Sequence, residues 1–183
     1  TKEAQENVAV QVAEQMSDFL LDGIVVNALN MPSVSAEDAP KLAPYMSLAE
    51  QVGSLAGQIQ IGSLDSIHLE FAGPVGDLNT KPLVALLLKA IFQGTLDSVN
   101  VVNAPLVAKE RNVDVHESRT DDARAYTNEI RVVLNLGDSK REISVAGTLF
   151  SGQPRIISVN GVTLEAELTP HMVYVRNQDQ PGQ

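Results

Sequence analysis

The sequence of 183 residues contains no cysteine and no tryptophan. The lack of cysteine excludes disulfides, thiolate zinc sites and cysteine nucleophiles. It also fits a reducing compartment, so we expect a cytoplasmic protein. Four phenylalanines and three tyrosines are too few for an aromatic platform on which bases or sugars could stack.

The sequence also lacks any apolar run of about eighteen residues, and its start, TKEAQENVAV, has neither the basic nor the apolar region of a signal peptide. Its formal net charge of −10 disfavours nucleic acid and anionic membranes as partners. The chain begins at Thr1 and ends in the turn-like segment QDQPGQ, from which we expect a piece of a longer protein. A hydrophobic share of 44% is enough for one sizeable core, with or without an extra arm.

Positive charge is concentrated in the middle of the chain. Between Lys109 and Arg155, eight basic residues stand among eight acidic ones, whereas both flanks are strongly acidic. A small anion could bind there, because guanidinium groups match phosphates and carboxylates in bidentate geometry. The alternative is that these arginines point outward along strands as a solvated face.

Apolar residues recur at helical spacing in three segments of the first half. These segments run from Ala4 to Leu20, from about Pro44 to Gln58, and from Thr80 to Gly94. The third is apolar nearly all round, which predicts the most buried helix. The segment GSLAG, at 53–57, lies within the second helical pattern and therefore predicts close helix packing, not a phosphate-binding loop.

Three residues are candidates for helix ends. Thr1 and Thr80 are N-cap types at the start of the first and third helices, and Gly23 can end the first helix in a left-handed conformation.

The second half of the chain has the alternation of β-strands. Ile130–Leu136 and Ile143–Leu149 predict one hairpin, with Gly137 in its turn, and Asn160-Gly161 predicts a type I′ turn in a second hairpin. In the first hairpin predicted in this way, Arg131 and Arg141 lie opposite each other. Glu129 or Glu142 could lie between these two positive charges. Further extended segments are expected at 67–71, 99–101, 113–118 and 172–176, with a short helix from 103 to 111.

Helices therefore come first and antiparallel strands later. This order predicts an α+β fold, with a mixed, largely antiparallel sheet, helices packed on one side and a preceding N-terminal helical arm.

No arrangement of residues typical of catalysis is present in the sequence. His68, His116 and His171 are far apart in the chain, and none stands at metal-ligand spacing from another donor. His68, between Ser66 and Glu70, is expected to point to water. No GxSxG elbow occurs, which disfavours a serine hydrolase.

The first 32 residues, TKEAQENVAVQVAEQMSDFLLDGIVVNALNMP, resemble the closing helix and tail of the D-2-hydroxyacid dehydrogenases. The following residues are similar to the intervening domain of the long, multi-domain D-3-phosphoglycerate dehydrogenases, in LAEQVGSLAGQI (48–59), VNAP (102–105), GTLF (147–150) and VNGV (159–162). HMVYVRNQDQPG resembles the opening of an ACT domain. The resemblance divides the chain into 1–32, 33–169 and 170–183.

The resemblance implies a parent enzyme that oxidises 3-phosphoglycerate to 3-phosphohydroxypyruvate with NAD, on the way to L-serine. In that family the catalytic residues and the NAD-binding turn lie upstream of Thr1, so no catalytic residue, cofactor or metal is expected in this chain. The resemblance also implies an allosteric site for a phosphate-like anion and a role in joining subunits. A related domain occurs in L-serine dehydratases.

Two functions follow as expectations. In the first, Arg119, Arg124, Lys140, Arg141 and Arg155 bind a small anionic effector that resembles 3-phosphoglycerate. In the second, the chain is an assembly or hinge module that self-associates through the apolar face of its first helix, formed by Val8, Val12, Met16 and Leu20.

Overall fold

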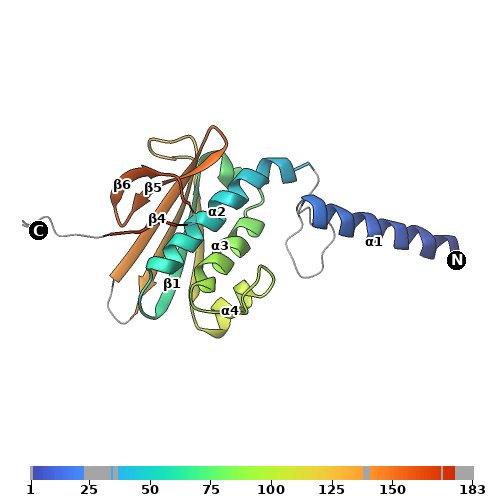
Figure 1. The fold of residues 1–183 in the computed structure, drawn as a ribbon, viewed down its shortest axis with the longest axis horizontal. Helices are drawn as coiled ribbons and strands as arrows, with labels where there is room; N and C mark the ends of the chain where they lie inside the picture. The colour runs from blue at the N-terminus through green and yellow to red at the C-terminus, as the bar shows by residue number, and fades with distance from the viewer. Residues whose placement is uncertain (1, 23–33, 35–36, 138–140, 170, 176–183) are drawn as a thin grey trace, which may run out of the picture.

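The computed structural model describes residues 2–22, 34, 37–137, 141–169 and 171–175. In these residues it contains one long N-terminal helix, a compact layer of helices and one six-stranded sheet (Figure 1). The helices are α1 (Lys2–Asp22), α2 (Ala39–Ile59), α3 (Lys81–Gln93) and α4 (Ala104–Glu110), with a 3-10 turn at Gly73–Asp77. The strands are β1 (Leu64–Ala72), β2 (Asp114–Thr120), β3 (Glu129–Leu136), β4 (Arg141–Phe150), β5 (Gln153–Val159) and β6 (Val162–Ala166).

The sheet has the strand order β2-β1-β3-β4-β5-β6. Strands β1 and β2 run parallel, and every other neighbouring pair is antiparallel. The parallel pair requires a long crossover, which α3 and α4 supply. Helices α2 and α3 lie on one face of the sheet (Figure 1), and the core between the two layers is apolar. The predicted α+β fold, with helices on one side of a largely antiparallel sheet, is confirmed.

Helix α1 was predicted from Ala4 to Leu20 and spans Lys2–Asp22. It lies apart from the sheet and the other helices (Figure 1), and its apolar side chains are exposed. Thr1 and Gly23, the residues expected at its two ends, lie outside the described part of the chain. The three-part division of the chain remains a prediction.

Helix α2 begins five residues earlier than predicted, so the expected start at Pro44 is wrong. Pro44 lies inside the helix, where it lacks an amide hydrogen for the helical bond to Pro40. Tertiary burial outweighs this loss, because Leu42, Leu48 and Val52 have no exposed surface.

The two glycines of the GSLAG segment set how closely α2 approaches α3. A Cβ on Gly53 would lie 2.9 Å from the Cβ of Ala90, and one on Gly57 would overlap the carbonyl oxygen of Ile91. The prediction of close helix packing is confirmed, since only glycine leaves room for the facing backbone.

Helix α3 is buried on most of its surface, as predicted. Thr80 occupies its N-cap position, but its side chain makes no capping bond, so that expectation is wrong. The Thr80 hydroxyl instead donates to Oε1 of Glu117 on β2 at 2.7 Å. A fully buried hydroxyl needs a partner, and the neighbouring strand supplies it.

Both predicted hairpins are present. Asn160 and Gly161 have φ values of 50° and 79°, as a type I′ turn requires. In the first hairpin the expected pairing is wrong, because Arg131 lies opposite Ala146 and Arg141 lies opposite Leu136. The first residue of β4 pairs with the last residue of β3, which carries Arg141 away from Arg131.

Two expected strands are not formed in the described residues. Residues 101–103 form turns that lead into α4, and residues 172–175 belong to no strand. In the latter segment Val173 is 86% exposed and Val175 is 74% exposed. Alternation of apolar and polar residues alone does not make a strand, because a strand also needs a neighbouring strand for its backbone hydrogen bonds.

Candidate functional site

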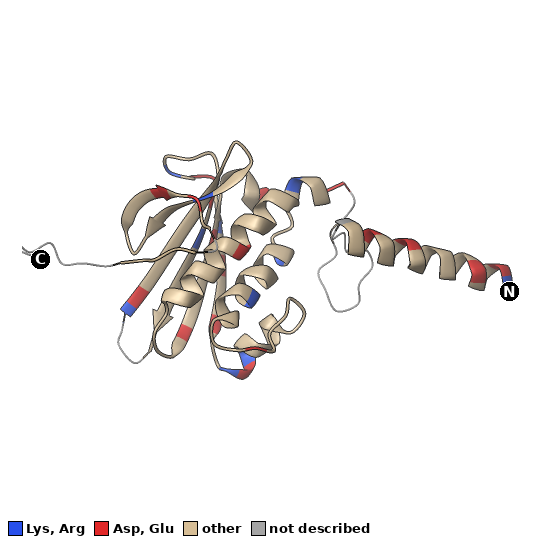
Figure 2. Cartoon of the chain, in the orientation of Figure 1, with Lys and Arg blue, Asp and Glu red and all other residues tan. Residues whose placement is uncertain are grey.

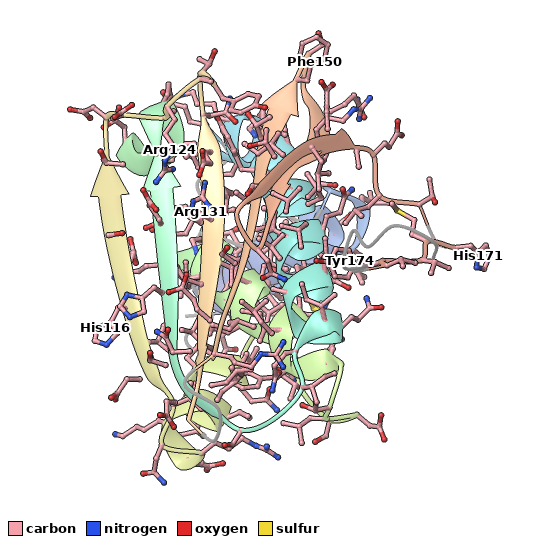
Figure 3. The ribbon with its side chains drawn as sticks, turned by 90° about the vertical axis from the view of Figure 1, so that its left-hand side faces the viewer. His116, Arg124, Arg131, Phe150, His171 and Tyr174 are labelled. Carbon is pink, nitrogen blue, oxygen red and sulfur yellow. The ribbon has the colours of Figure 1, made fainter. Side chains whose placement is uncertain are left out.

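The uncovered face of the sheet carries a cluster of four charged side chains. Two of them, Arg124 and Arg131, are labelled in Figure 3. Strand alternation turns Leu69 and Phe71 of β1 toward the helices and Glu70 to the opposite face. Glu70 lies opposite Arg131 of β3, and Glu129 of β3 occupies the next row on the same face.

The fourth member, Arg124, comes from the loop that follows β2. Its φ of 60° is a left-handed conformation, and its amide donates to Oδ1 of Asp122 at 2.8 Å. Its guanidinium then reaches back over the sheet, donating from Nη1 to Oε1 of Glu129 at 2.6 Å and from Nη2 to Oε1 of Glu70 at 3.2 Å. The loop is therefore fastened to the sheet by charge-assisted hydrogen bonds.

Glu129 is the centre of this four-charge cluster of Glu70, Arg124, Glu129 and Arg131. Its side chain is only 2% exposed. Arg131 donates to it from Nε at 2.8 Å, and Nη2 of Arg131 forms an ion pair with the same Oε1 at 2.6 Å. A buried carboxylate needs such compensation, and two guanidinium groups provide it. Burial opposes the charged form of Arg124, but attraction and hydrogen bonds from Glu129 and Glu70 prevail and raise the pKa of Arg124.

Arg119 has a different role at the edge of the sheet. It donates from Nε to Glu117 at 2.9 Å, from Nη1 to the carbonyl oxygen of Gly76 at 3.2 Å and from Nη2 to Thr80 Oγ1 at 2.6 Å. These bonds tie β2 to the segment that precedes α3. All three guanidinium nitrogens are thus engaged within the protein.

Arg155 and Arg141 are held less firmly. Arg155 of β5 donates to the carbonyl oxygen of Pro154 at 2.8 Å and pairs with Glu167 at 3.3 Å, a carboxylate that is 67% exposed. Arg141 is exposed at the first position of β4. Lys140 lies outside the described residues.

The sheet register separates the predicted cations. Arg124 sits over the end of the sheet formed by Ala72 and Glu129, and Arg155, opposite Thr148, lies toward the same end. Arg141 is at the other end, opposite Leu136. Arg119 lies on the helix-covered side of the edge strand, because Glu117 and Arg119 meet Thr80 there. The described members of the predicted set therefore form no single cluster.

Sequence reasoning missed that Glu70 and Glu129 hold Arg124, and that Arg131 shares both of these carboxylates. It named Glu129 as one possible neighbour of Arg131, and this contact is present. The outward positions of Glu70, Glu129 and Arg131 in their strands are visible in the sequence. Whether these side chains contact one another depends on the β1–β3 register, which cannot be read from the sequence.

Two surface pockets lie along β2. One, of about 260 Å³, is lined by Lys81, Val84, Ala85, Val101, Val102, Pro105 and Glu117. The other, of about 490 Å³, is lined by Pro105, Ala108, Lys109, Asn112, Val113, Asp114 and Val115. None of the four predicted arginines lines either pocket, so neither supports the predicted anion site directly.

A metal or cofactor site would need clustered donor side chains or a glycine-rich turn among the described residues. These residues contain no group of three or more histidine, aspartate or glutamate side chains that could hold a metal ion. Gly53 and Gly57 are packed against α3, so this segment does not form a dinucleotide-binding turn. No helix among the residues placed by the structure is long and apolar enough to cross a membrane.

Two of the three histidines, which are far apart in the sequence, lie close together in space. His68 and His116 lie directly opposite each other on β1 and β2, with ring centres 4.7 Å apart and ring planes at 29°. Their separation in the sequence hides this contact, because the parallel pairing passes through the α3–α4 crossover. His68 is exposed on the uncovered face, as predicted.

The chain thus consists of a sheet domain covered by helices on one face, preceded by the separate helix α1 (Figure 1). The family model of the D-3-phosphoglycerate dehydrogenase intervening domain matches residues 41–160. The chain therefore belongs to this family of intervening domains, which confirms the resemblance found in the sequence.

Individual relatives extend the similarity to the whole chain. D-3-phosphoglycerate dehydrogenases of Synechocystis sp., Bacillus subtilis and Methanocaldococcus jannaschii are 35%, 33% and 32% identical to it. Each alignment covers 100% of this chain but only 33%, 35% and 34% of the respective relative. The chain thus spans about a third of the length of the curated relatives it matches.

Proposed function

We propose that this chain is a regulatory and assembly portion of an NAD-dependent D-3-phosphoglycerate dehydrogenase. The longer enzyme would oxidise 3-phosphoglycerate to 3-phosphohydroxypyruvate in L-serine biosynthesis in the cytoplasm. The observation that carries the proposal is the alignment of the entire chain with one third of relatives that bear this name. The dehydrogenase names of these relatives favour this function over a domain of an L-serine dehydratase.

Within that enzyme, the chain binds a small phosphate or carboxylate effector. Which arginine binds the anion depends on the bonds that each arginine already makes within the protein. Displacing Arg124 would leave the buried Glu129 with one cation fewer, and displacing Arg119 would undo the contact between β2 and Thr80. Arg155 can exchange the exposed carboxylate of Glu167 for a ligand at little cost. Arg155 is therefore the principal effector contact, and Arg141 is a further exposed cation.

The experiment is a calorimetric titration of the 183-residue chain with 3-phosphoglycerate, and with inorganic sulfate as the minimal anion. Wild type is expected to bind both, and Arg155→Ala to lose most of the affinity. Arg111→Ala, which removes an exposed arginine at the end of α4, is the matched control and should bind as wild type does. Absence of binding by wild type, or equal affinity of Arg155→Ala and wild type, contradicts the effector site.

A second function, assembly, is favoured by the surface of α1. Val8, Val12 and Met16 are 58%, 48% and 60% exposed, and Leu20 is 75% exposed on the same predicted face. The charges of α1 are mainly acidic (Figure 2), so the helix is apolar along one side and anionic elsewhere. An apolar stripe of this length favours burial against another chain.

The assembly proposal is tested by sedimentation velocity of the chain at micromolar concentration. Wild type should sediment as a dimer or larger species, and the double variant Met16→Glu/Leu20→Glu as a monomer. A monomeric wild type contradicts self-association through α1.

A further inference from the structure

The His68–His116 pair on the uncovered face of the sheet has no role in the functions above. The two residues occupy directly opposing positions of the parallel β1–β2 pair, so their side chains leave the sheet side by side. Both side chains are exposed, and the ring centres are 4.7 Å apart. Figure 3 shows His116 on the edge strand, well away from the labelled Arg124 and Arg131.

The neighbours of the pair leave the rings accessible. On the same face, Ser66 and Glu70 flank His68 along β1, and Asp114 and Ser118 flank His116 along β2. Val133 of β3 lies opposite His68 on its other side. Glu70 is already paired with Arg124 and Arg131. Ser66 and Ser118 are small, Asp114 is an exposed carboxylate, and no cation of the four-charge cluster lies in the row of the two histidines.

The spacing of the rings suits one shared metal ion. Bonds from imidazole nitrogen to zinc are about 2.0–2.1 Å, so two rings bound to one ion at an angle of about 90–110° have their centres roughly 4.5–5.2 Å apart. The observed 4.7 Å falls in this range. The rings are now nearly stacked, and rotation of two exposed side chains would turn a nitrogen of each toward a common point.

We propose that His68 and His116 form a two-histidine site for a divalent transition metal ion of the zinc, nickel and copper class. Neutral imidazole is a preferred ligand of these ions. Because no group of three protein donors exists among the described residues, water fills the remaining coordination positions. The ion would link the edge strand β2 to β1 and thereby stabilise that edge of the sheet.

The test is a calorimetric titration of the 183-residue chain with Zn²⁺ and, separately, Ni²⁺ in a buffer that does not bind metals. His68→Ala and His116→Ala should each weaken binding at least about tenfold, since loss of one ligand removes the gain from holding two on one surface. His171→Ala removes an exposed histidine outside the sheet and is the matched control, expected to bind as wild type does.

Two further measurements distinguish binding at this site from nonspecific metal binding. The affinity should fall as the pH is lowered from 7 to 5, because protons compete for imidazole. Saturating Zn²⁺ should raise the melting temperature of wild type but not of His68→Ala/His116→Ala. No saturable binding by wild type, or equal affinities for wild type and the double variant, overturns the proposal, with circular dichroism confirming that the variants are folded.

Discussion

Glu70 and Arg131 face each other directly across the β1–β3 strand pair, with Nε of Arg131 3.8 Å from Oε2 of Glu70. Arg131 and the loop residue Arg124 both pair with Glu129, which is nearly inaccessible to solvent. The cluster is balanced, with two positive and two negative charges. It therefore fixes the loop to the sheet, and an anion would have to displace Glu129 or Glu70 to bind there.

Replacing Glu129 by glutamine should destabilise the fold by about 2–3 kcal/mol, because hydrogen bonds from two arginines to a buried charge are lost or weakened. Urea unfolding measures this change. Glu142→Gln, at an exposed position of β4, is the control and should change stability by less than about 0.5 kcal/mol. If both substitutions changed the free energy of unfolding equally, the cluster would contribute no more to stability than an exposed carboxylate does.

Gly57→Ala should cost about 1–3 kcal/mol, since the added methyl group meets the backbone of Ile91 and forces α2 away from α3. The midpoint of chemical unfolding reports the loss. Ser47→Ala, on an exposed position of the same helix, should leave the midpoint nearly unchanged. A neutral Gly57→Ala variant would contradict the close contact between the helices.

The stability of the chain should fall as the pH rises above about 10, the ordinary pKa of tyrosine. Burial raises the pKa of Tyr45, so the unfolded chain loses the phenolic proton first. Below pH 10 the phenol is neutral in both states, and its contribution is lost only as the pH rises through the higher folded value. Comparing urea unfolding at pH 8 and pH 11, Tyr45→Phe should lose less stability than wild type. Equal losses would exclude Tyr45 as a source of the alkaline sensitivity.

Gly161→Ala should cost about 1 kcal/mol through backbone strain alone. The position has a φ of 79°, and no atom lies within 4 Å of the added Cβ, so no steric clash contributes. Thermal unfolding compared with Thr163→Ala, an exposed substitution on the adjoining strand, isolates the effect of the turn. A variant as stable as wild type would mean that the turn relaxes to another type.

The sequence was most informative where structure depends on near neighbours. The helical spacing in α1 and α3, the Asn160-Gly161 turn and the alternation in β3 and β4 each predicted an element that is present. The start of α2 was missed because Pro44 is a local helix breaker, and burial of Leu42 overrides it.

Side-chain partnerships were harder to predict because they depend on long-range register. The contact of His68 with His116 and that of Arg124 with Glu70 both span strands separated by a crossover or a loop. Alternation shows which face of a strand a residue occupies, but not which strand lies beside it. The sequence therefore identified Arg124 without identifying the two carboxylates that hold it, although it named Glu129 as a possible neighbour of Arg131.

We propose that this chain serves a phosphoglycerate dehydrogenase by binding and assembly, without carrying its chemistry. The most direct test measures 3-phosphoglycerate-dependent formation of NADH by the full-length protein and by the 183-residue chain side by side. The account predicts turnover by the full-length protein and none by the chain alone. Turnover by the isolated chain, or an inactive full-length protein, would contradict it.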